Sequence, residues 1–109
     1  MTDTNEPSVL LSFPEPGVAE LTLNRPSATN ALSLELQTLL SKYFTELANN
    51  KDIRCILLTG GDKVFAAGGD ITSLIDADPI EIYQRHTERL WAPIEQCPIP
   101  VVAAVNGYA

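Results

Sequence analysis

Histidine and cysteine, which many nucleophilic and metal-dependent catalytic sites use, are scarce in this sequence. Among its 109 residues are one histidine, His86, and two cysteines, Cys55 and Cys97. The cysteines lack metal-ligand spacing, so we predict reduced, packed thiols instead of a disulfide framework. A Ser-His-Asp or Cys-His arrangement would depend on His86, which falls within a predicted helix without a positioned partner. We therefore expect no metal ion and no histidine-activated nucleophile.

Positive charge and long apolar runs are also scarce. Seven Lys and Arg residues stand against fourteen Asp and Glu residues, which gives a formal net charge of −7 and disfavours nucleic acid and anionic membranes as partners. No apolar run approaches the roughly 18 residues that a membrane span needs. Residues 1–7 are polar and acidic, unlike the basic start of a signal peptide. These features predict a cytoplasmic protein with no nucleic-acid or membrane partner.

Two nucleotide-binding motifs are absent from the sequence. It contains neither G-x-G-x-x-G nor G-x-x-x-x-G-K-[ST], so a nucleotide cofactor is not indicated. Three acidic residues, Asp76, Asp78 and Glu81, lie close together but lack the spacing of a calcium loop. We interpret them as helix-capping residues.

The first half of the chain has a clear hydrophobic pattern. The β-rich runs 9–13 and 18–23 flank Pro14-Glu15-Pro16-Gly17, which predicts a hairpin. Residues 33–49 carry apolar side chains at three-and-four spacing and begin with Ser33, a good N-cap. This pattern predicts one amphipathic helix.

The second half predicts two further strands and a second helix. The continuous apolar run 53–59 is typical of a strand covered on both faces, and residues 99–105 predict another buried strand. A long helix is predicted to begin at Asp78-Pro79 and to kink or end at Pro93. Its apolar face includes Trp91, which we interpret as core or interface. The element order predicts an α/β fold with parallel crossovers.

The segment Val64-Phe65-Ala66-Ala67-Gly68-Gly69-Asp70-Ile71 is the most informative part of the sequence. Its adjacent glycines lack a Cβ, so a ligand could approach the main chain and accept hydrogen bonds from it. The alternative is a plain strand-to-helix connection in which the glycines relieve steric strain. The upstream pair Gly60-Gly61 and the positive end of a helix beginning after the loop favour a binding loop for a developing negative charge.

Three separated stretches of the chain resemble the enoyl-CoA hydratase/isomerase (crotonase) family. Asn24-Arg25-Pro26 followed by Asn30-Ala31-Leu32 is similar to the family's N-R-P-x-x-x-N-A-L segment, residues 65–71 to its thioester loop, and residues 100–109 to the strand before its second glycine loop. The resemblance implies an α/β, crotonase-like (ClpP/crotonase) fold of repeated ββα units, present in part. Residues 9–109 would form the N-terminal part of an acyl-CoA-binding domain, after a flexible segment 1–8.

The resemblance also implies a site for an acyl-CoA thioester. The backbone N–H of Gly69 corresponds to the family's first oxyanion donor, and a donor of this kind lowers the barrier by roughly 3–4 kcal/mol. Ala28 and Ala67 correspond to positions where the main chain meets coenzyme A, and Arg25 and Lys63 are candidates for its phosphates. Asp70 is expected to line the site and cap the following helix turn. The implied substrate-binding set is Arg25, Ala28, Ala67, Gly68, Gly69, Asp70, Ile71 and Thr72.

The activity that this resemblance implies is the addition of water to a 2-enoyl-CoA through an oxyanion-stabilised enolate. Coenzyme A would be part of the substrate, so no cofactor is expected. Double-bond isomerisation, other thioester chemistry and a non-catalytic CoA-binding or assembly fragment remain alternatives. In the family, the second oxyanion donor and the glutamate acid/base residues follow the stretch that 100–109 resembles. We therefore expect the 109 residues alone to be inactive, and a homotrimer or hexamer for the complete protein.

Overall fold

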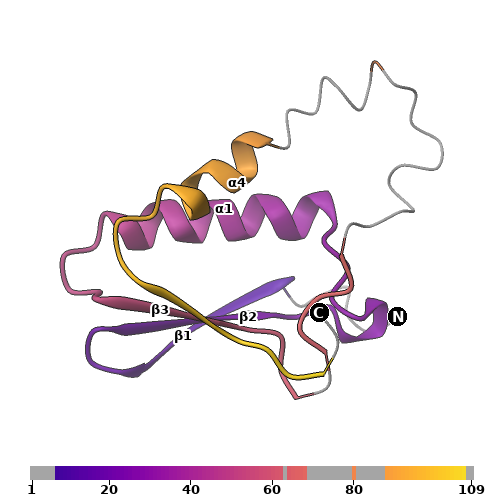
Figure 1. Cartoon of the computed structure of the whole chain (residues 1–109), viewed down its shortest axis with the longest axis horizontal. Helices are drawn as coiled ribbons and strands as arrows, with labels where there is room; N and C mark the ends of the chain where they lie inside the picture. The colour runs from indigo at the N-terminus through magenta and orange to yellow at the C-terminus, as the bar shows by residue number, and fades with distance from the viewer. Residues whose placement is uncertain (1–6, 63, 69–79, 81–87, 108–109) are drawn as a thin grey trace.

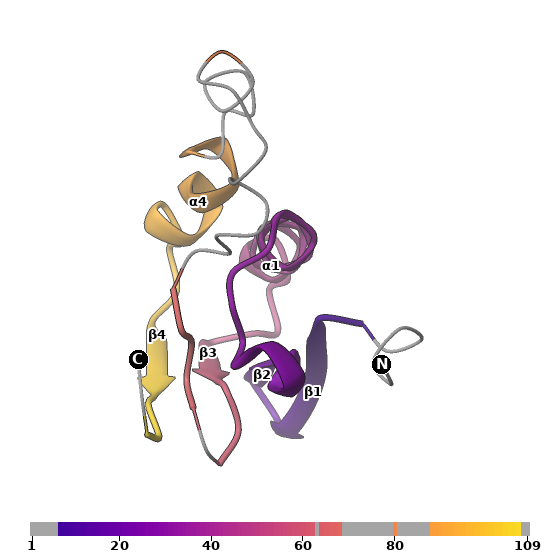
Figure 2. The same ribbon diagram turned by 90° about the vertical axis from the view of Figure 1, so that its right-hand side faces the viewer.

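A computed structural model of the chain describes residues 7–62, 64–68, 80 and 88–107 (Figure 1). Its four strands form one sheet in the order β1-β2-β3-β4. β1 and β2 are antiparallel, whereas β2–β3 and β3–β4 are parallel, as the element order predicted. The helices α1 and α4 lie on the same side of this sheet (Figure 2). The elements are β1 (Val9–Glu15), β2 (Val18–Leu23), α1 (Leu34–Ala48), β3 (Cys55–Thr59), α4 (Glu88–Glu95) and β4 (Val101–Ala104).

The predicted hairpin is confirmed. Val9 pairs with Leu23 and Glu15 with Val18, so β1 extends two residues beyond its predicted end. Along β2, three apolar residues at every second position are buried, namely Ala19, Leu21 and Leu23. Because alternate side chains of a strand point to opposite faces, this alternation directs one face of β2 into the core.

The amphipathic helix is confirmed as α1. Its buried residues lie at the predicted three-and-four spacing: Leu36, Leu40, Phe44 and Leu47. Ser33 is the N-cap, and its Oγ accepts a hydrogen bond of 3.1 Å from the backbone N–H of Leu36. The same end of the helix is tied to the chain before β1, because the Ser8 hydroxyl donates to Glu35 Oε1 at 2.6 Å.

Replacing Ser33 with alanine is expected to lower the free energy of unfolding by about 1 kcal/mol, because one backbone donor in the first turn of α1 loses its partner. Urea denaturation followed by circular dichroism measures this change. Ser33→Thr keeps a hydroxyl acceptor and is the matched control. Equal losses in the two variants would contradict the capping role of the Ser33 side chain.

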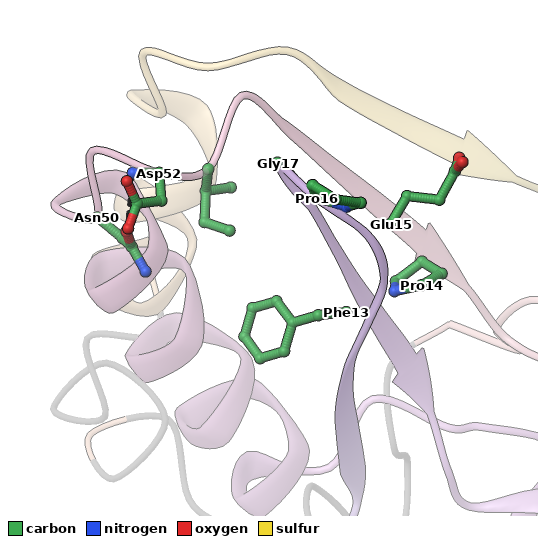
Figure 3. A pocket seen from close by; sticks show the side chains of 8 residues that line it. Phe13, Pro14, Glu15, Pro16, Gly17, Asn50 and Asp52 are labelled. Atoms are coloured by element: carbon green, nitrogen blue, oxygen red, sulfur yellow. Dashed lines mark hydrogen bonds between the residues drawn. The ribbon is translucent and has the colours of Figure 1, made fainter.

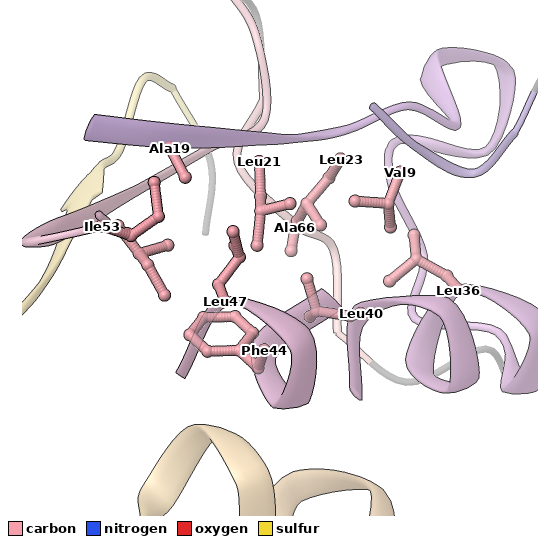
Figure 4. Close-up of a cluster of buried hydrophobic side chains, with 11 residues drawn as sticks. Val9, Ala19, Leu21, Leu23, Leu36, Leu40, Phe44, Leu47, Ile53 and Ala66 are labelled. Atoms are coloured by element: carbon pink, nitrogen blue, oxygen red, sulfur yellow. The ribbon is translucent and has the colours of Figure 1, made fainter. Parts of the chain in front are cut away.

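The hydrophobic core lies between α1 and the adjacent face of the sheet (Figure 4). Phe44, Leu21, Leu36 and Ile56 are its largest fully buried apolar residues, together with the smaller Val9. Trp91 and Ile94 of α4 pack against this cluster while partly exposed. The structure therefore confirms the interpretation of Trp91 as a packed residue.

Two strand predictions were wrong about burial. β3 begins at Cys55 instead of Ile53, and only Ile56 within it is fully buried, since both described helices cover the same side of the sheet. β4 is shorter than the run 99–105 and lies at the edge of the sheet, with Val102 53% exposed. An apolar run shows that a strand can be buried, but burial also needs an element that covers it.

The second helix was predicted to kink or end at Pro93, and it does not end there. α4 contains Pro93 and continues to Glu95. Proline removes its own donor and crowds the carbonyl four residues earlier, but the turn beyond it still closes through a 2.9 Å bond from Gln96 N to Ala92 O. The predicted start at Asp78-Pro79 and the residue His86 lie outside the described residues.

The folded unit already includes Ser8, the residue before β1. This residue is buried, and its carbonyl accepts a 2.7 Å hydrogen bond from Asn24 N. The Asn24 side chain also donates to Pro7 O at 3.0 Å. The packed region therefore begins before the predicted boundary at Val9.

Candidate functional site

The connection between β2 and α1, residues 24–32, is a tight turn that we call the proline turn. Pro26–Ala28 form a 3-10 helix, η2, with the proline at its start. At this position the φ that proline fixes suits the helix, and the missing N–H breaks no hydrogen bond within it. Thr29 and Asn30 follow with φ of 50° and 56°. Left-handed backbone is uncommon for a β-branched residue such as threonine. The turn is held closed by a 2.8 Å bond from Asn30 N to Arg25 O.

Arg25 stabilises the proline turn from within. Its Nη1 donates to Ala31 O at 2.7 Å, and its backbone N–H donates to Asn30 Oδ1 at 2.7 Å. The side chain is therefore partly buried and oriented by the turn. Contact between Arg25 and a coenzyme A phosphate stays a prediction.

The segment after β3, residues 60–68, lies against the proline turn, and we call it the glycine loop; residue 63 is not among its described residues. Two backbone hydrogen bonds join the segments: Ala67 N donates to Thr29 O at 3.1 Å, and Leu32 N donates to Gly68 O at 2.8 Å. Stretches more than thirty residues apart in sequence thus form one two-segment scaffold.

The side chain of Asn30 fills the junction between the two segments. Its Nδ2 donates to Gly60 O at 3.0 Å, Val64 O at 3.2 Å and Phe65 O at 3.1 Å. Asn30 is only 1% exposed. This buried amide stabilises the loop backbone, because the same three carbonyl groups would lower the stability of the fold if they were buried without a hydrogen-bond donor.

The glycines of the loop serve two different purposes. A Cβ on Gly60 would lie 2.6 Å from Phe65 Cα and would also collide with the carbonyl oxygens of Val64 and Phe65. Gly61 and Gly68 instead have positive φ, 96° and 100°, with open space around a hypothetical Cβ. Gly60 is therefore needed for close backbone approach, and the other two for their backbone conformation.

A cleft of about 690 Å³ opens beside this scaffold. Asp62 is the only charged residue among those described as lining it, so the lining is otherwise neutral. This composition suits an uncharged part of a ligand better than a phosphate group. The lining residues are Thr22, Leu23, Asn24, Pro26, Thr29, Asn30, Gly60, Gly61, Asp62, Val64 and Ala67.

The structure brings four of the sequence-predicted site residues to this scaffold. Ala67 is exposed and lines the cleft, but its N–H is used by Thr29 O, so a ligand would meet its carbonyl or methyl group. Gly68, Arg25 and Ala28 belong to the two joined segments and do not line the cleft. The remaining four, Gly69, Asp70, Ile71 and Thr72, lie outside the described residues, as does Lys63.

A second pocket lies at the far end of the β1–β2 hairpin (Figure 3). Its volume is about 420 Å³, and Phe13, Glu15, Asn50 and Asp52 contribute to its lining. The sequence analysis gave these residues a role in the hairpin turn but no role in binding or catalysis. We therefore place the candidate site at the 690 Å³ cleft.

Within residues 7–62, 64–68, 80 and 88–107, no cluster of three His, Cys, Asp or Glu side chains could hold a metal ion. No helix in that part is both long and apolar enough to cross a membrane. Cys55 and Cys97 are half-buried and not joined in a disulfide, as predicted.

Sequence reasoning missed the side chains that hold the two segments together. It used Asn30 only as part of a family-like motif and gave it no contact. Asn106, after β4, also donates to the loop, with its Nδ2 3.0 Å from Gly61 O. An asparagine between a proline turn and a helix signals left-handed backbone, but its partners depend on tertiary structure.

Comparison with known proteins identifies what the chain is similar to. Residues 14–109 match the sequence profile of a family described as enoyl-CoA hydratase/isomerase. The chain is 39% identical over 92 residues to a mitochondrial enoyl-CoA hydratase of Pongo abelii, covering 84% of this chain and 32% of that protein. It is 35% identical over 106 residues to the 1,2-epoxyphenylacetyl-CoA isomerase of Escherichia coli, covering 92% of this chain and 40% of that protein.

A solved structure shows the same fold. The crystal structure of an enoyl-CoA hydratase of Mycobacterium smegmatis superposes with a TM-score of 0.82 at 36% identity, covering 92% of this chain and 40% of that one. The chain thus spans 32–40% of the length of these three proteins.

Proposed function

Because the chain belongs to the enoyl-CoA hydratase/isomerase family, we propose that it forms the part of an acyl-CoA enzyme that holds the thioester. The observation that carries this proposal is the scaffold of the proline turn and the glycine loop beside a largely uncharged cleft. Such a cleft fits the pantetheine and acyl portions of an acyl-CoA. The adenine and phosphates would lie toward Arg25 and Ala28.

The proposed chemistry is addition of water to a 2-enoyl-CoA. Negative charge develops on the thioester oxygen as an enolate forms, and a fixed backbone donor stabilises that charge. We assign this donor to the N–H of Gly69, with Asp70, Ile71 and Thr72 lining the acyl portion. Hydration also needs a base that activates water and an acid that protonates the α-carbon. The resemblance assigns neither to these 109 residues, so we expect binding without turnover.

Double-bond isomerisation is a second candidate reaction, because the matching family is described as enoyl-CoA hydratase/isomerase. Both reactions pass through a stabilised thioester oxyanion, so the loop alone does not discriminate between them. A homotrimer or hexamer is proposed for the complete protein, with the thioester as its small-molecule partner.

The 109-residue protein is expected to bind a 2-enoyl-CoA saturably in calorimetric titration and to leave its enoyl absorbance unchanged. Ala67→Asp should weaken binding by roughly tenfold or more, because it places a carboxylate that would lose its hydration in the cleft proposed for the uncharged pantetheine and acyl portions. Ala103→Asp makes the same change at an exposed residue outside the cleft and is the control.

Absence of saturable binding by the folded wild-type protein would overturn the proposed site. Loss of enoyl absorbance above the rate without protein would overturn the expected lack of turnover. Equal affinities for Ala67→Asp and Ala103→Asp would place the ligand away from the 690 Å³ cleft.

A further inference from the structure

We infer that Asn30 is a positioning residue, whose side-chain amide sets where the glycine loop lies relative to the proline turn and hence relative to the acyl thioester. The contacts that support this inference are independent of the ligand. The consequence for the thioester rests on the proposed function.

The amide of Asn30 holds the first half of the loop at three points. The carbonyl oxygens of Gly60, Val64 and Phe65 all lie 3.0–3.2 Å from its Nδ2. These three residues come together because Gly60 lets the backbone of the loop close on itself without a Cβ clash. One buried side chain therefore fixes both ends of the segment 60–65.

The same side chain fixes its own position within the proline turn. Its Oδ1 accepts a 2.7 Å bond from Arg25 N, and its backbone has a φ of 56°. Asparagine tolerates this backbone and offers donor and acceptor groups on one short side chain. An aspartate has the same shape, but its carboxylate would present acceptor oxygens to three carbonyl oxygens.

The second half of the glycine loop, residues 66–68, connects the part that Asn30 contacts to the cleft. Ala67 and Gly68 lie two and three residues after Phe65 and are joined to the proline turn by one backbone bond each. Ala67 reaches the cleft surface. The acyl group, which coenzyme A lacks, is proposed to lie in this cleft, so release of Gly60, Val64 and Phe65 should weaken binding of the enoyl thioester more than binding of coenzyme A itself.

The test compares Asn30→Asp with Asn49→Asp in the 109-residue protein. Asn49 also donates its Nδ2 to a backbone carbonyl, Thr45 O at 2.9 Å, but is exposed at the end of α1. In Asn30→Asp we expect amide hydrogen exchange in residues 60–68 to accelerate by roughly tenfold or more. In Asn49→Asp exchange in this loop should be unchanged.

The second readout is the ratio of affinities for a 2-enoyl-CoA and for coenzyme A. We expect this ratio to fall in Asn30→Asp and to keep its wild-type value in Asn49→Asp. An unchanged ratio together with unchanged loop exchange would overturn the positioning role. If the wild-type protein binds neither ligand, the proposed function fails, and the loop exchange still decides whether Asn30 holds the loop.

A measurement on the wild-type protein covers the case in which Asn30→Asp does not fold. The side-chain amide protons of Asn30 should exchange with D₂O at least roughly tenfold more slowly than those of exposed Asn49, because they are buried and hydrogen-bonded. Equally fast exchange of the two side chains would overturn the inference.

Discussion

Replacing Phe44 with alanine is expected to lower the free energy of unfolding by about 3–5 kcal/mol, because it removes a fully buried ring and leaves a cavity. Phe44 is 0% exposed and projects from α1 into the core beneath β2. Domains of this size are stable by only about 5–15 kcal/mol. The variant should therefore lose a large part of the total stability.

Urea denaturation measures the loss, and Phe13→Ala provides the matched control. Both substitutions remove the same atoms, but Phe13 is 58% exposed beside the hairpin turn. Its replacement should change the free energy of unfolding by about 0.5 kcal/mol or less, as surface substitutions usually do. Similar losses in both variants would contradict the placement of Phe44 at the centre of the core.

Replacing Gly60 with alanine is expected to lower the free energy of unfolding by about 3 kcal/mol. This value is the upper end of the usual range for overpacking. The added methyl group would collide with the backbone of Val64 and Phe65, which cannot rotate away as a side chain can. Relief requires a shift of the loop, and this shift would break the hydrogen bonds that the Asn30 amide donates to the carbonyls of Val64 and Phe65.

Gly61→Ala separates this steric effect from a conformational one. Gly61 has a φ of 96° and open space around a hypothetical Cβ. Its replacement should therefore lower the free energy of unfolding by only about 1–2 kcal/mol, because an alanine is strained in left-handed backbone. Backbone chemical shifts should move at residues 64–65 in Gly60→Ala and much less in Gly61→Ala. A smaller loss of stability for Gly60→Ala than for Gly61→Ala would show that the loop does not close on itself.

Several elements could be predicted because their signals are local. Ser33 caps the helix that follows it, and the apolar residues of α1 face the core because three-and-four spacing places them on one side. The turn after Phe13 joins two strands whose pairing follows from their proximity in sequence. Such features depend on contacts within a few residues, so the chain encodes them without reference to the rest of the fold.

Burial of the later strands could not be predicted in the same way. The apolar residues around Val102 indicated a buried strand, yet β4 forms an exposed edge of the sheet. Pro93 indicated a kink or an end of the helix, and α4 continues past it to Glu95. Both outcomes depend on what packs against the element, which neither apolar content nor a single proline specifies.

By itself the sequence determined the order of elements, the family resemblance and the glycines that mark the candidate site. The way that site is held together depends on contacts that form in the folded chain. The amide of Asn30 meets carbonyls thirty or more residues away, and Gly60 is required because two backbone stretches come into contact there. Contacts between distant segments arise only when the sheet and helix bring them together, so a sequence pattern can identify the residues but cannot show which partners they meet.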